Sequence, residues 1–532
     1  MGTVKSIKVR NLRSFPNESE FFDIKKVNLL VGRNSSGKSS FLRVFPLLRQ
    51  SFEETTTGPI LWFGKYVDFG DFNYALNKNL ASEEKVIYFD FKLDVEVRPE
   101  FDDVFPYDFD NDDMSLLNLF KEKMFTLDVE LSLGVESING TTRACYVSIK
   151  SSEYLIEMIP SRKSNTVSVK SVNLKTGRVF KSQRKLFYSD GEFIPEIYEM
   201  VAVEDKEKIV LRGNRLPSDA HEALVDYLNL YVFEYKNNRI DKSLRSIGFA
   251  SKERYLKEMK KVFKSNEYSR YQGFNESESL SSDVYMYALI GNVNSIIQGV
   301  NKELRSFFTM IRYLGPVRAT AERFYRYQDL RVNEIDHMGE NLPMVIKSLT
   351  GYQRRRLEAW MLTNFGFCLE LESTGSHMAI MVRENGEKDS YNISDMGFGY
   401  SQLLPIVVSI WMQINSVGQG NFAYVDSERK EKVIVIEQPE LHLHPEMQYK
   451  FAQAIVKIVS LKSSSRIRFV FETHSKHMID AFGHAIQDGD LPSDYINITL
   501  FDKGEDKCTH LTSSGFDEDG FLENWPVGFL SA

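Results

Sequence analysis

An eight-residue glycine-rich segment, Gly32–Ser39, constrains the fold of this chain most strongly. It fits the pattern G-x-x-x-x-G-K-[ST], follows the apolar run Val27–Val31 and precedes a helical pattern with apolar residues on one face. Glycines at both ends let the backbone N–H groups turn inward toward an anion. The segment therefore predicts a buried strand, a phosphate-binding loop and the N-terminus of a helix.

This arrangement indicates an α/β P-loop NTPase with ATP and Mg²⁺ as cofactors. Lys38 would bring a full charge to the β- and γ-phosphates, and Ser39 would offer its hydroxyl to Mg²⁺. Pro46 should kink or shorten the helix that follows. The nucleotide-binding residues expected here are Gly32, Asn34, Ser35, Ser36, Gly37, Lys38, Ser39 and Ser40.

Two further apolar runs end in polar residues. Val433–Ile436 predicts a buried strand followed by Glu437, which is placed to hold Mg²⁺ together with Ser39. Phe469–Phe471 predicts another strand, followed by Glu472, Thr473, His474 and Ser475. His474 there could donate to a γ-phosphate or to the attacking water. The alternatives are a core strand that ends in exposed acids and a structural histidine.

A second helix start resembles an anion site. Gly397, Gly399, Ser401 and Gln402 precede an apolar helical run that begins at Leu403. One nucleotide needs only one phosphate-binding loop in each chain. We therefore expect this second segment to serve the nucleotide held by another copy, which predicts a homodimer.

The pattern of apolar residues changes twice along the chain. Short alternating strands predominate over 84–213, helical spacing over 216–350, and strands alternate with helices after 365, which implies a parallel sheet covered on both sides. The expected domains are 1–215, 216–345 and 346–532. The expected strands are 4–10, 27–31, 84–98, 126–135, 143–150, 166–188 with a hairpin turn at Thr176-Gly177, 367–372, 378–383, 433–436, 467–471 and 495–501, and the expected helices are 218–235, 283–313 and 448–461.

The net charge of −8 does not favour nucleic-acid binding by the whole surface, but the charge is unevenly spread. Residues 161–189 hold eight basic side chains and no acidic one, whereas 100–113 are rich in aspartate. Such runs are either solvated surface or a local face for nucleic acid or an acidic protein. The members are Arg162, Lys163, Lys170, Lys175, Arg178, Lys181, Arg184 and Lys185, against Asp102, Asp103, Asp108, Asp110, Asp112 and Asp113.

The sequence predicts a cytoplasmic protein without a membrane span or signal peptide, because it has no apolar run of about 18 residues and no apolar segment at its start. Cys145, Cys368 and Cys508 lack CxxC spacing, which fits a reducing compartment. His442 and His444 leave a zinc site open as an alternative to a loop at the dimer interface.

Together the four segments resemble the ABC-type ATPase heads of the SMC, RecF and OLD-like group within the AAA ATPases. Glu437–Pro445 and Glu472–Ser475 are similar to the E-x-P-E-L-H-L-H-P and E-T-H-S stretches of small prokaryotic ATPases of this group. The likeness covers about 1–50 and 310–530, and the region 100–310 has no diagnostic signature. Asn11–Phe15, Tyr313–Arg318 and Trp525–Phe529 extend it.

The resemblance implies an ATPase head in two lobes with an antiparallel β subdomain and a helical insertion, and a head-to-head dimer around ATP with Arg13 near the nucleotide. It also implies a role in anti-phage defence together with a nuclease or toxin, as in Septu and some retron systems. In such retron systems a reverse transcriptase and its DNA product can take part. The chain ends 58 residues after His474, too few for the Toprim nuclease of OLD-like proteins, so we expect the effector on another polypeptide.

One residue departs from the group's pattern. Gln438 stands where transporter and SMC heads have the glutamate that acts as general base, and an amide cannot accept a proton. Either Glu440 takes this role or turnover is slow. Three functions remain open: a regulatory ATPase of a defence complex, a RecF- or SMC-like DNA-repair ATPase, and a nucleotide-binding scaffold.

Overall fold

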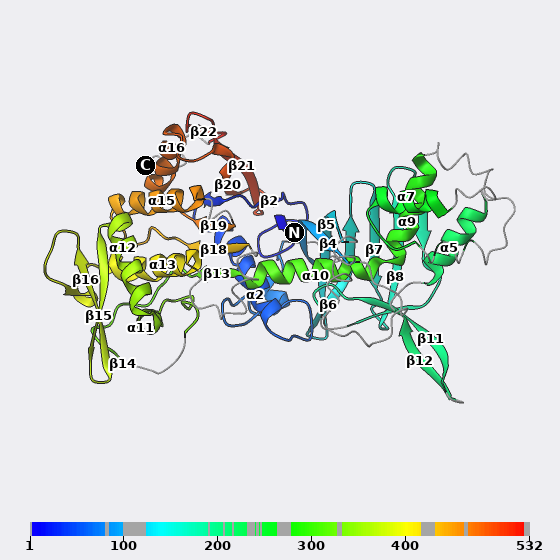
Figure 1. Ribbon diagram of the computed structural model, residues 1–532, viewed down its shortest axis with the longest axis horizontal. Helices are drawn as coiled ribbons and strands as arrows, with labels where there is room; N and C mark the ends of the chain where they lie inside the picture. The colour runs from blue at the N-terminus through cyan, green and yellow to red at the C-terminus, as the bar shows by residue number, and fades with distance from the viewer. Residues whose placement is uncertain are drawn as a thin grey trace.

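The computed structural model describes most of the chain, and its strands form three sheets (Figure 1). The residues described are 3–79, 85–98, 124–189, 192–205, 208–214, 218–230, 240, 244, 247–262, 278–326, 332–415, 431–461 and 466–525. The aspartate-rich run Asp102–Asp113 and the end of the tail, 526–529, lie outside them. No helix in this described part is long and apolar enough to cross a membrane.

A seven-stranded sheet, counted over the described residues, joins the two ends of the chain. The first five strands in its order are parallel, and the last two are antiparallel additions. The predicted parallel sheet is thus confirmed. The order is β13 (Ile311–Leu314), β18 (Lys432–Glu437), β19 (Ile467–Glu472), β3 (Val27–Gly32), β20 (Ile496–Lys503), β21 (Thr509–Phe516) and β22 (Leu522–Glu523).

This parallel sheet separates two hydrophobic cores. In β3, Leu30 belongs to the core shared with the antiparallel sheet, whereas Val27, Leu29 and Val31 face the other core. Alternation by two along a strand sends successive side chains to opposite faces. Apolar residues on both faces explain why these strands read as uninterrupted apolar runs.

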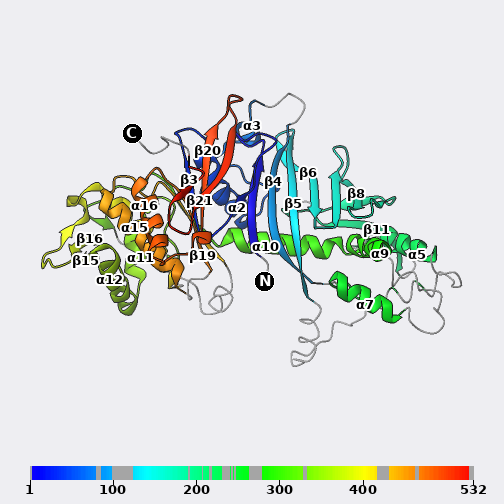
Figure 2. The ribbon, with the colours of Figure 1, turned by 90° about the horizontal axis from the view of Figure 1, so that it is seen from above.

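The first core lies beneath an antiparallel sheet of eleven strands in the described part (Figure 2). Its edge nearest the parallel sheet is formed by β2 and β1, and its far edge by β11 and β12. The strands are β1 (Thr3–Arg10), β2 (Phe22–Asp23), β4 (Ile87–Val97), β5 (Phe125–Ile138), β6 (Thr141–Lys150), β7 (Tyr154–Pro160), β8 (Thr166–Asn173), β9 (Val179–Lys181), β10 (Leu186–Tyr188), β11 (Ile197–Asp205) and β12 (Lys208–Asn214).

Helix α10 (Val293–Thr309) runs along this sheet and connects its far part to the parallel sheet (Figures 1 and 2). Two asparagines of α10 satisfy the backbone of the segment they cross: Asn294 bonds both backbone groups of Ile197, and Asn301 bonds both of Ile194. Such pairing fixes the helix against the sheet. The other helices of this half are α1 (Lys38–Leu42), α2 (Val44–Glu53), α3 (Phe72–Ala75), α5 (Ser218–Asn229), α7 (Lys252–Val262) and α9 (Glu278–Gly291).

Helices and a small sheet surround the second core. Helix α13 (Phe398–Ile414) and the adjacent pair α15 (Pro445–Ser460) and α16 (Lys476–Gln487) contribute apolar residues to it. The remaining elements are α11 (Leu342–Ser348), α12 (Gly351–Phe365), the short helices η2 (Ile393–Asp395) and η4 (Ser493–Tyr495), and the strands β14 (Tyr325–Arg326), β15 (Phe367–Thr374), β16 (His377–Glu384) and β17 (Tyr391–Asn392).

Most expected elements are confirmed, and one predicted helix is wrong. The helix after the glycine-rich loop breaks at Arg43, and Pro46 lies in the first turn of α2, where it cannot donate to the carbonyl four residues earlier. Gly177 turns with φ 73° between β8 and β9. The segment predicted as one helix over 283–313 forms two, α9 and α10, which are separated at Asn292. The second helix ends at Thr309, because Ile311–Leu314 pairs with β18 in the parallel sheet.

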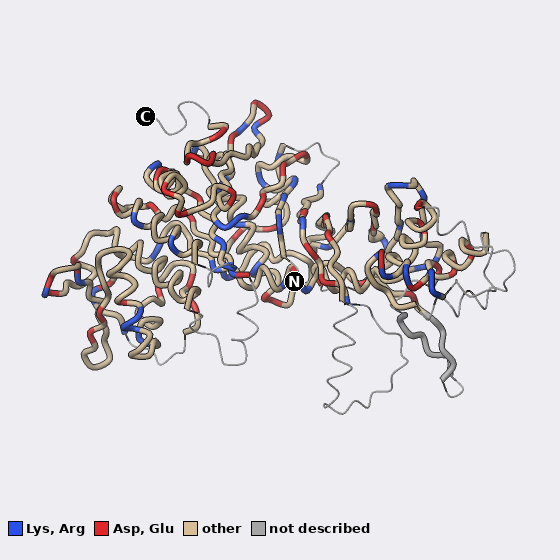
Figure 3. Tube along the Cα trace, turned by 45° about the horizontal axis from the view of Figure 1, so that its top comes forward, with Lys and Arg blue, Asp and Glu red and all other residues tan. Residues whose placement is uncertain are grey.

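The basic stretch 161–189 lies on β8, β9, β10 and their loops. Basic and acidic residues both occur in the half of the molecule that holds these strands (Figure 3). Counted over the described residues, five of its eight cations form ion pairs within the chain. The pairs are Arg162–Glu136, Lys170–Glu157, Lys175–Glu278, Arg178–Asp283 and Arg184–Glu222.

Candidate nucleotide-binding site

The glycine-rich loop joins the C-terminal end of β3 to α1, as its pattern predicts. Gly37 caps α1 with φ 103°, a conformation that favours glycine. Gly32 is needed for a different reason: a Cβ there would lie 2.4 Å from the carbonyl oxygen of Phe501 on β20. The turn therefore requires glycine at position 37, and the close approach of β20 requires it at position 32.

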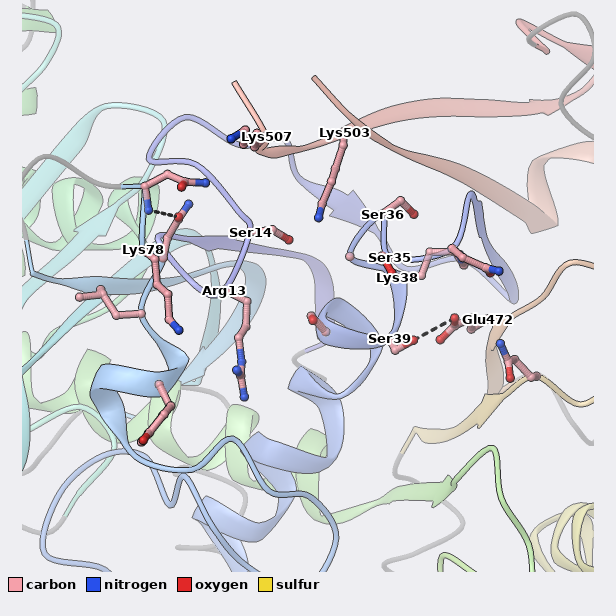
Figure 4. A pocket seen from close by; sticks show the side chains of 18 residues that line it. Arg13, Ser14, Ser35, Ser36, Lys38, Ser39, Lys78, Glu472, Lys503 and Lys507 are labelled. Atoms are coloured by element: carbon pink, nitrogen blue, oxygen red, sulfur yellow. Dashed lines mark hydrogen bonds between the residues drawn. The ribbon is translucent and has the colours of Figure 1, made fainter. Parts of the chain in front are cut away.

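A cavity of about 690 Å³ opens beside this loop (Figure 4). It brings together Arg13, Gln438 and most of the loop residues expected from the sequence. It also includes residues that the sequence did not single out. The lining residues are Arg13, Ser14, Asn34, Ser35, Ser36, Gly37, Lys38, Ser39, Ser40, Tyr74, Leu76, Asn77, Lys78, Asn79, Gln438, Glu472, Lys503 and Lys507.

The lining of this cavity is strongly cationic. Among the described residues that line it, five are basic and Glu472 is the one acid. A concave surface with such an excess of positive charge favours a polyanion. The basic residues are Arg13, Lys38, Lys78, Lys503 and Lys507, which come from four separate parts of the chain.

Lys38 is buried at the floor of the cavity. Its Nζ donates to the carbonyl oxygens of Gly32 and Arg33, both at 2.8 Å. Burial lowers the pKa of the Lys38 ammonium, while the Glu472 and Glu440 carboxylates oppose that shift. The loop thus holds a cation in a largely desolvated place, where an anionic phosphate would be a strong partner.

The carboxylate beside Ser39 is not the one expected from the sequence. The Ser39 hydroxyl donates to Oε1 of Glu472 at 2.9 Å (Figure 4). Glu437, which the sequence predicts for the metal site, accepts from Arg43 at 2.7 and 3.0 Å and from the Tyr313 hydroxyl at 2.6 Å. Arg318 donates to the Glu437 backbone oxygen at 2.8 Å. The same signal that marked Glu437, an acid at a strand end, could have marked Glu472.

The three remaining catalytic candidates lie close together but differ in exposure to the cavity. Gln438 lines it, with a backbone φ of 44°. Glu440 accepts the backbone N–H of His474 at 2.7 Å, so it orients the histidine segment. Within the described residues, Oε2 of Glu440 and Nε2 of His474 are buried and have no hydrogen-bond partner. Burial raises the pKa of Glu440 and lowers that of His474.

A comparison with known protein families shows which family this chain belongs to. The model of the family described as "AAA ATPase domain" matches residues 3–479. This chain belongs to that family. A comparison with curated proteins finds no match.

Solved structures similar to this AAA ATPase are SMC head domains. The head with an extended coiled coil, bound to the C-terminal domain of ScpA, from Pyrococcus furiosus is 11% identical, with 96% of each chain covered and a TM-score of 0.33. The head from Thermotoga maritima is 9% identical, with 96% of this chain and 98% of that one covered and a TM-score of 0.31. Values this low carry no argument about function.

The second anion segment of this AAA ATPase lies away from the cavity, since none of its residues lines it. Ser401 and Gln402 are buried, and their side chains donate to the carbonyl oxygens of Phe398 and Arg318. Gly399 packs against the His442 backbone, whereas Gly397 has open space at its Cβ position. The groups exposed at the start of α13 are therefore Ser394, Asp395, Gly397 and Phe398.

The hairpin formed by β20 and β21 closes one side of the cavity. Thr509 donates to the carbonyl oxygen of Ser36 at 2.8 Å, and its hydroxyl lies 2.7 Å from that of Ser14. The hairpin brings Lys503 and Lys507 to the cavity wall (Figure 4). No local sequence pattern marks these lysines, because only the pairing of β20 with β3 places them there.

The zinc alternative finds no support among the described residues, where no group of three or more His, Cys, Asp and Glu side chains could hold a metal. His442 packs edge-on against Phe398, and His444 caps α15. All three cysteines are free.

The cavity of this AAA ATPase fits ATP with Mg²⁺. The excess of cations suits a triphosphate, and the Ser39 hydroxyl with the Glu472 carboxylate supplies the oxygen donors that Mg²⁺ prefers. Oε2 of Glu472 is buried without a partner within the described part, as expected for a group that awaits a cation.

Proposed function

We propose that this protein binds and hydrolyses ATP as a dimer and thereby regulates a separate effector in anti-phage defence. Each P-loop cavity would hold one ATP, and the segment Ser394–Gln402 of the second copy would complete the site. The observation that carries the ATP part is the cavity itself, which Lys38 of the loop Gly32–Ser39 and four further basic side chains line together. The effector part is supported by the resemblance of Glu437–Pro445 and Glu472–Ser475 to defence ATPases.

In this site the chain's own residues bind and orient the triphosphate. Lys38 would exchange its loop carbonyl partners for β- and γ-phosphate oxygens, and Arg13 would approach from the opposite wall. Mg²⁺, when bound, supplies charge neutralisation between the β- and γ-phosphates. His474, whose pKa burial lowers, would reach the γ-phosphate end as a neutral imidazole.

Dimerisation is supported by the separation of the two anion segments. One chain holds the cavity and the start of α13 in different places, so a single copy offers the nucleotide only one of them. At the start of α13, the open space at Gly397 leaves room for a ligand from another copy. The side chains of Ser401 and Gln402 are engaged within the chain, and the exposed Ser394 hydroxyl donates to Asn392. The backbone N–H groups of the first turn of α13 are therefore the better donors.

Slow turnover is the second part of the proposal. Gln438 lines the cavity at the position of the usual base, and its amide cannot accept the proton of the attacking water. Glu440 does not line the cavity and has one oxygen bound to His474, which favours an orienting role. If hydrolysis is absent altogether, the protein is a nucleotide-dependent scaffold.

A DNA-repair role has weaker support. It would need a free basic face, and five of the eight cations in 161–189 are ion-paired within the chain. Salt-sensitive binding to duplex DNA with stimulation of ATP turnover would revive this alternative.

The test combines three measurements on the purified protein. We expect ATP hydrolysis that depends on Lys38, and a shift from monomer to dimer by light scattering when ATP and Mg²⁺ are added. We expect duplex DNA to change neither. ATP binding without a change in mass would contradict the dimer. A nuclease, toxin or reverse transcriptase encoded beside this gene would support the effector, and co-purification with it in an ATP-dependent way would test it.

A further inference from the structure

Two glutamates end neighbouring strands of the parallel sheet, and their surroundings differ. Glu437 on β18 and Glu472 on β19 are register partners. In the order β18-β19-β3, it is the strand of Glu472 that pairs with β3, the strand that leads into the phosphate-binding loop. Strand order therefore places Glu472 nearer to Ser39 than Glu437.

The carboxylate of Glu437 is already fully engaged. Both of its oxygens accept from Arg43, and Oε1 also accepts from Tyr313. The residue is 1% exposed and does not line the cavity. To bind a metal it would have to give up the hydrogen bonds from Tyr313, which is buried, and from Arg43, whose side chain is 40% exposed.

The carboxylate of Glu472 has the opposite character. It is 3% exposed, lines the cavity and accepts a single side-chain hydrogen bond, from Ser39 (Figure 4). Its second oxygen is buried without a partner among the described residues. An unpaired buried carboxylate oxygen is unfavourable unless a cation or donor meets it.

The spacing of Ser39 and Glu472 matches a pair of metal ligands. Their oxygens lie 2.9 Å apart. Two adjacent ligands of an octahedral Mg²⁺, each about 2.05 Å from the ion, are about 2.9 Å apart. The same two oxygens can thus form a hydrogen bond without the ion and share the ion when it is present.

We infer that Glu472, together with Ser39, holds the Mg²⁺ of the bound nucleotide, and that Glu437 is a positioning residue that fixes Arg43. This inference rests on the proposed ATP site. It reverses the assignment that the order of motifs along the sequence predicts, in which Glu437 holds the metal.

The test compares Glu472→Gln with the matched variant Glu437→Gln at the adjacent strand end. Binding of a methylanthraniloyl-labelled ATP is measured by fluorescence over a range of MgCl₂ concentrations and in EDTA. For Glu472→Gln we expect the Mg²⁺ concentration at half-saturation to rise at least about tenfold, with Mg²⁺-free binding within about twofold of wild type. For Glu437→Gln we expect an unchanged midpoint and a lower melting temperature.

Each other outcome overturns the assignment. A Mg²⁺ midpoint that moves with Glu437→Gln and not with Glu472→Gln would return the metal to Glu437. A loss of turnover in Glu472→Gln at an unchanged midpoint would make Glu472 a general base instead. No nucleotide binding by the wild-type protein at any Mg²⁺ concentration would overturn the proposed function as well, which separates the two failures.

A folding defect would not block the test. If Glu472→Gln unfolds at a lower temperature than the binding assay, Glu472→Asp keeps the charge and withdraws it by one methylene. We expect that variant to raise the Mg²⁺ midpoint by at least threefold and to alter the electron paramagnetic resonance spectrum of Mn²⁺ bound with ATP. An unchanged midpoint and spectrum would overturn the inference.

Discussion

Two regions of this chain are rich in basic side chains, and they differ in where the acids lie. The stretch 161–189 holds eight cations close together in sequence, and among the described residues five of them are ion-paired with acids from other elements. The P-loop cavity collects five cations from distant parts of the chain around one carboxylate, Glu472. Among the described residues, no acid lies within ion-pair distance of those five.

The comparison shows that a run of charge in the sequence is a poor guide to a binding site. Ion pairs at a surface neutralise the field that a ligand would meet, whereas cations gathered in a concave place reinforce one another. The five predictions below test whether this difference decides which region binds anions.

The largest effect is expected from Lys38→Met. Removal of a buried cation from the phosphate site should lower ATP affinity by at least about 100-fold, since truncating one partner of a buried charge pair costs about 2–5 kcal/mol. Isothermal titration calorimetry measures this. Lys181→Met, an exposed lysine of the basic stretch, is the control and should bind ATP as wild type does. A loss of affinity below about threefold for Lys38→Met would contradict the conclusion that the cavity, and not the basic stretch, binds anions.

Gln438→Glu should raise the rate of ATP turnover rather than lower the affinity for ATP. It adds a proton acceptor to the cavity wall, and a well-placed general base contributes about 100-fold or more, so we expect kcat to rise about 30-fold. Steady-state phosphate release measures it. The companion variant Glu440→Ala separates the alternatives: no rise in Gln438→Glu, together with complete loss in Glu440→Ala, would identify Glu440 as the base.

The double reversal Lys503→Glu with Lys507→Glu should lower ATP affinity about tenfold, because two exposed cations of the cavity wall become anions. The loss should shrink as salt is raised from low to physiological strength. The matched control is Lys163→Glu with Lys181→Glu, two exposed lysines of the basic stretch. Equal losses in both double variants would mean that general charge, not the cavity, attracts the nucleotide.

Within the basic stretch, Arg178→Ala should affect stability rather than binding. Arg178 pairs with Asp283, a buried carboxylate that also accepts from Tyr227. Loss of this half-exposed cation should reduce the free energy of unfolding by about 1 kcal/mol. Urea denaturation measures it. Arg162→Ala, whose cation is mostly exposed, should cost less.

The smallest effect is expected from the triple reversal of Lys181, Arg184 and Lys185 to glutamate. If the stretch is solvated surface, binding of duplex DNA and of ATP should change by less than about twofold. Fluorescence anisotropy with labelled DNA at two salt concentrations measures it. A large loss of salt-sensitive DNA binding would instead support the nucleic-acid alternative.

The sequence by itself determined the parts that depend on adjacent residues. The strand, loop and helix around Gly32–Ser39, the apolar runs of β18, β19 and β20, and the hairpin at Gly177 were all predicted, since turn chemistry and burial pattern are local. The parallel sheet followed from uninterrupted apolar runs, which require cover on both faces. The end of α10 was misplaced because Ile311–Leu314 is apolar enough for either structure.

The tertiary structure alone decided which groups meet at the site. Strand order placed β19 beside β3, so Glu472 rather than Glu437 contacts Ser39. The carboxylate of Glu437 instead accepts hydrogen bonds from Arg43 and Tyr313. The β20–β21 hairpin brought Lys503 and Lys507 to the cavity, and acids from separate elements neutralised the basic stretch. Contacts between residues far apart along the chain depend on how its elements pack, and this packing cannot be inferred from local sequence patterns.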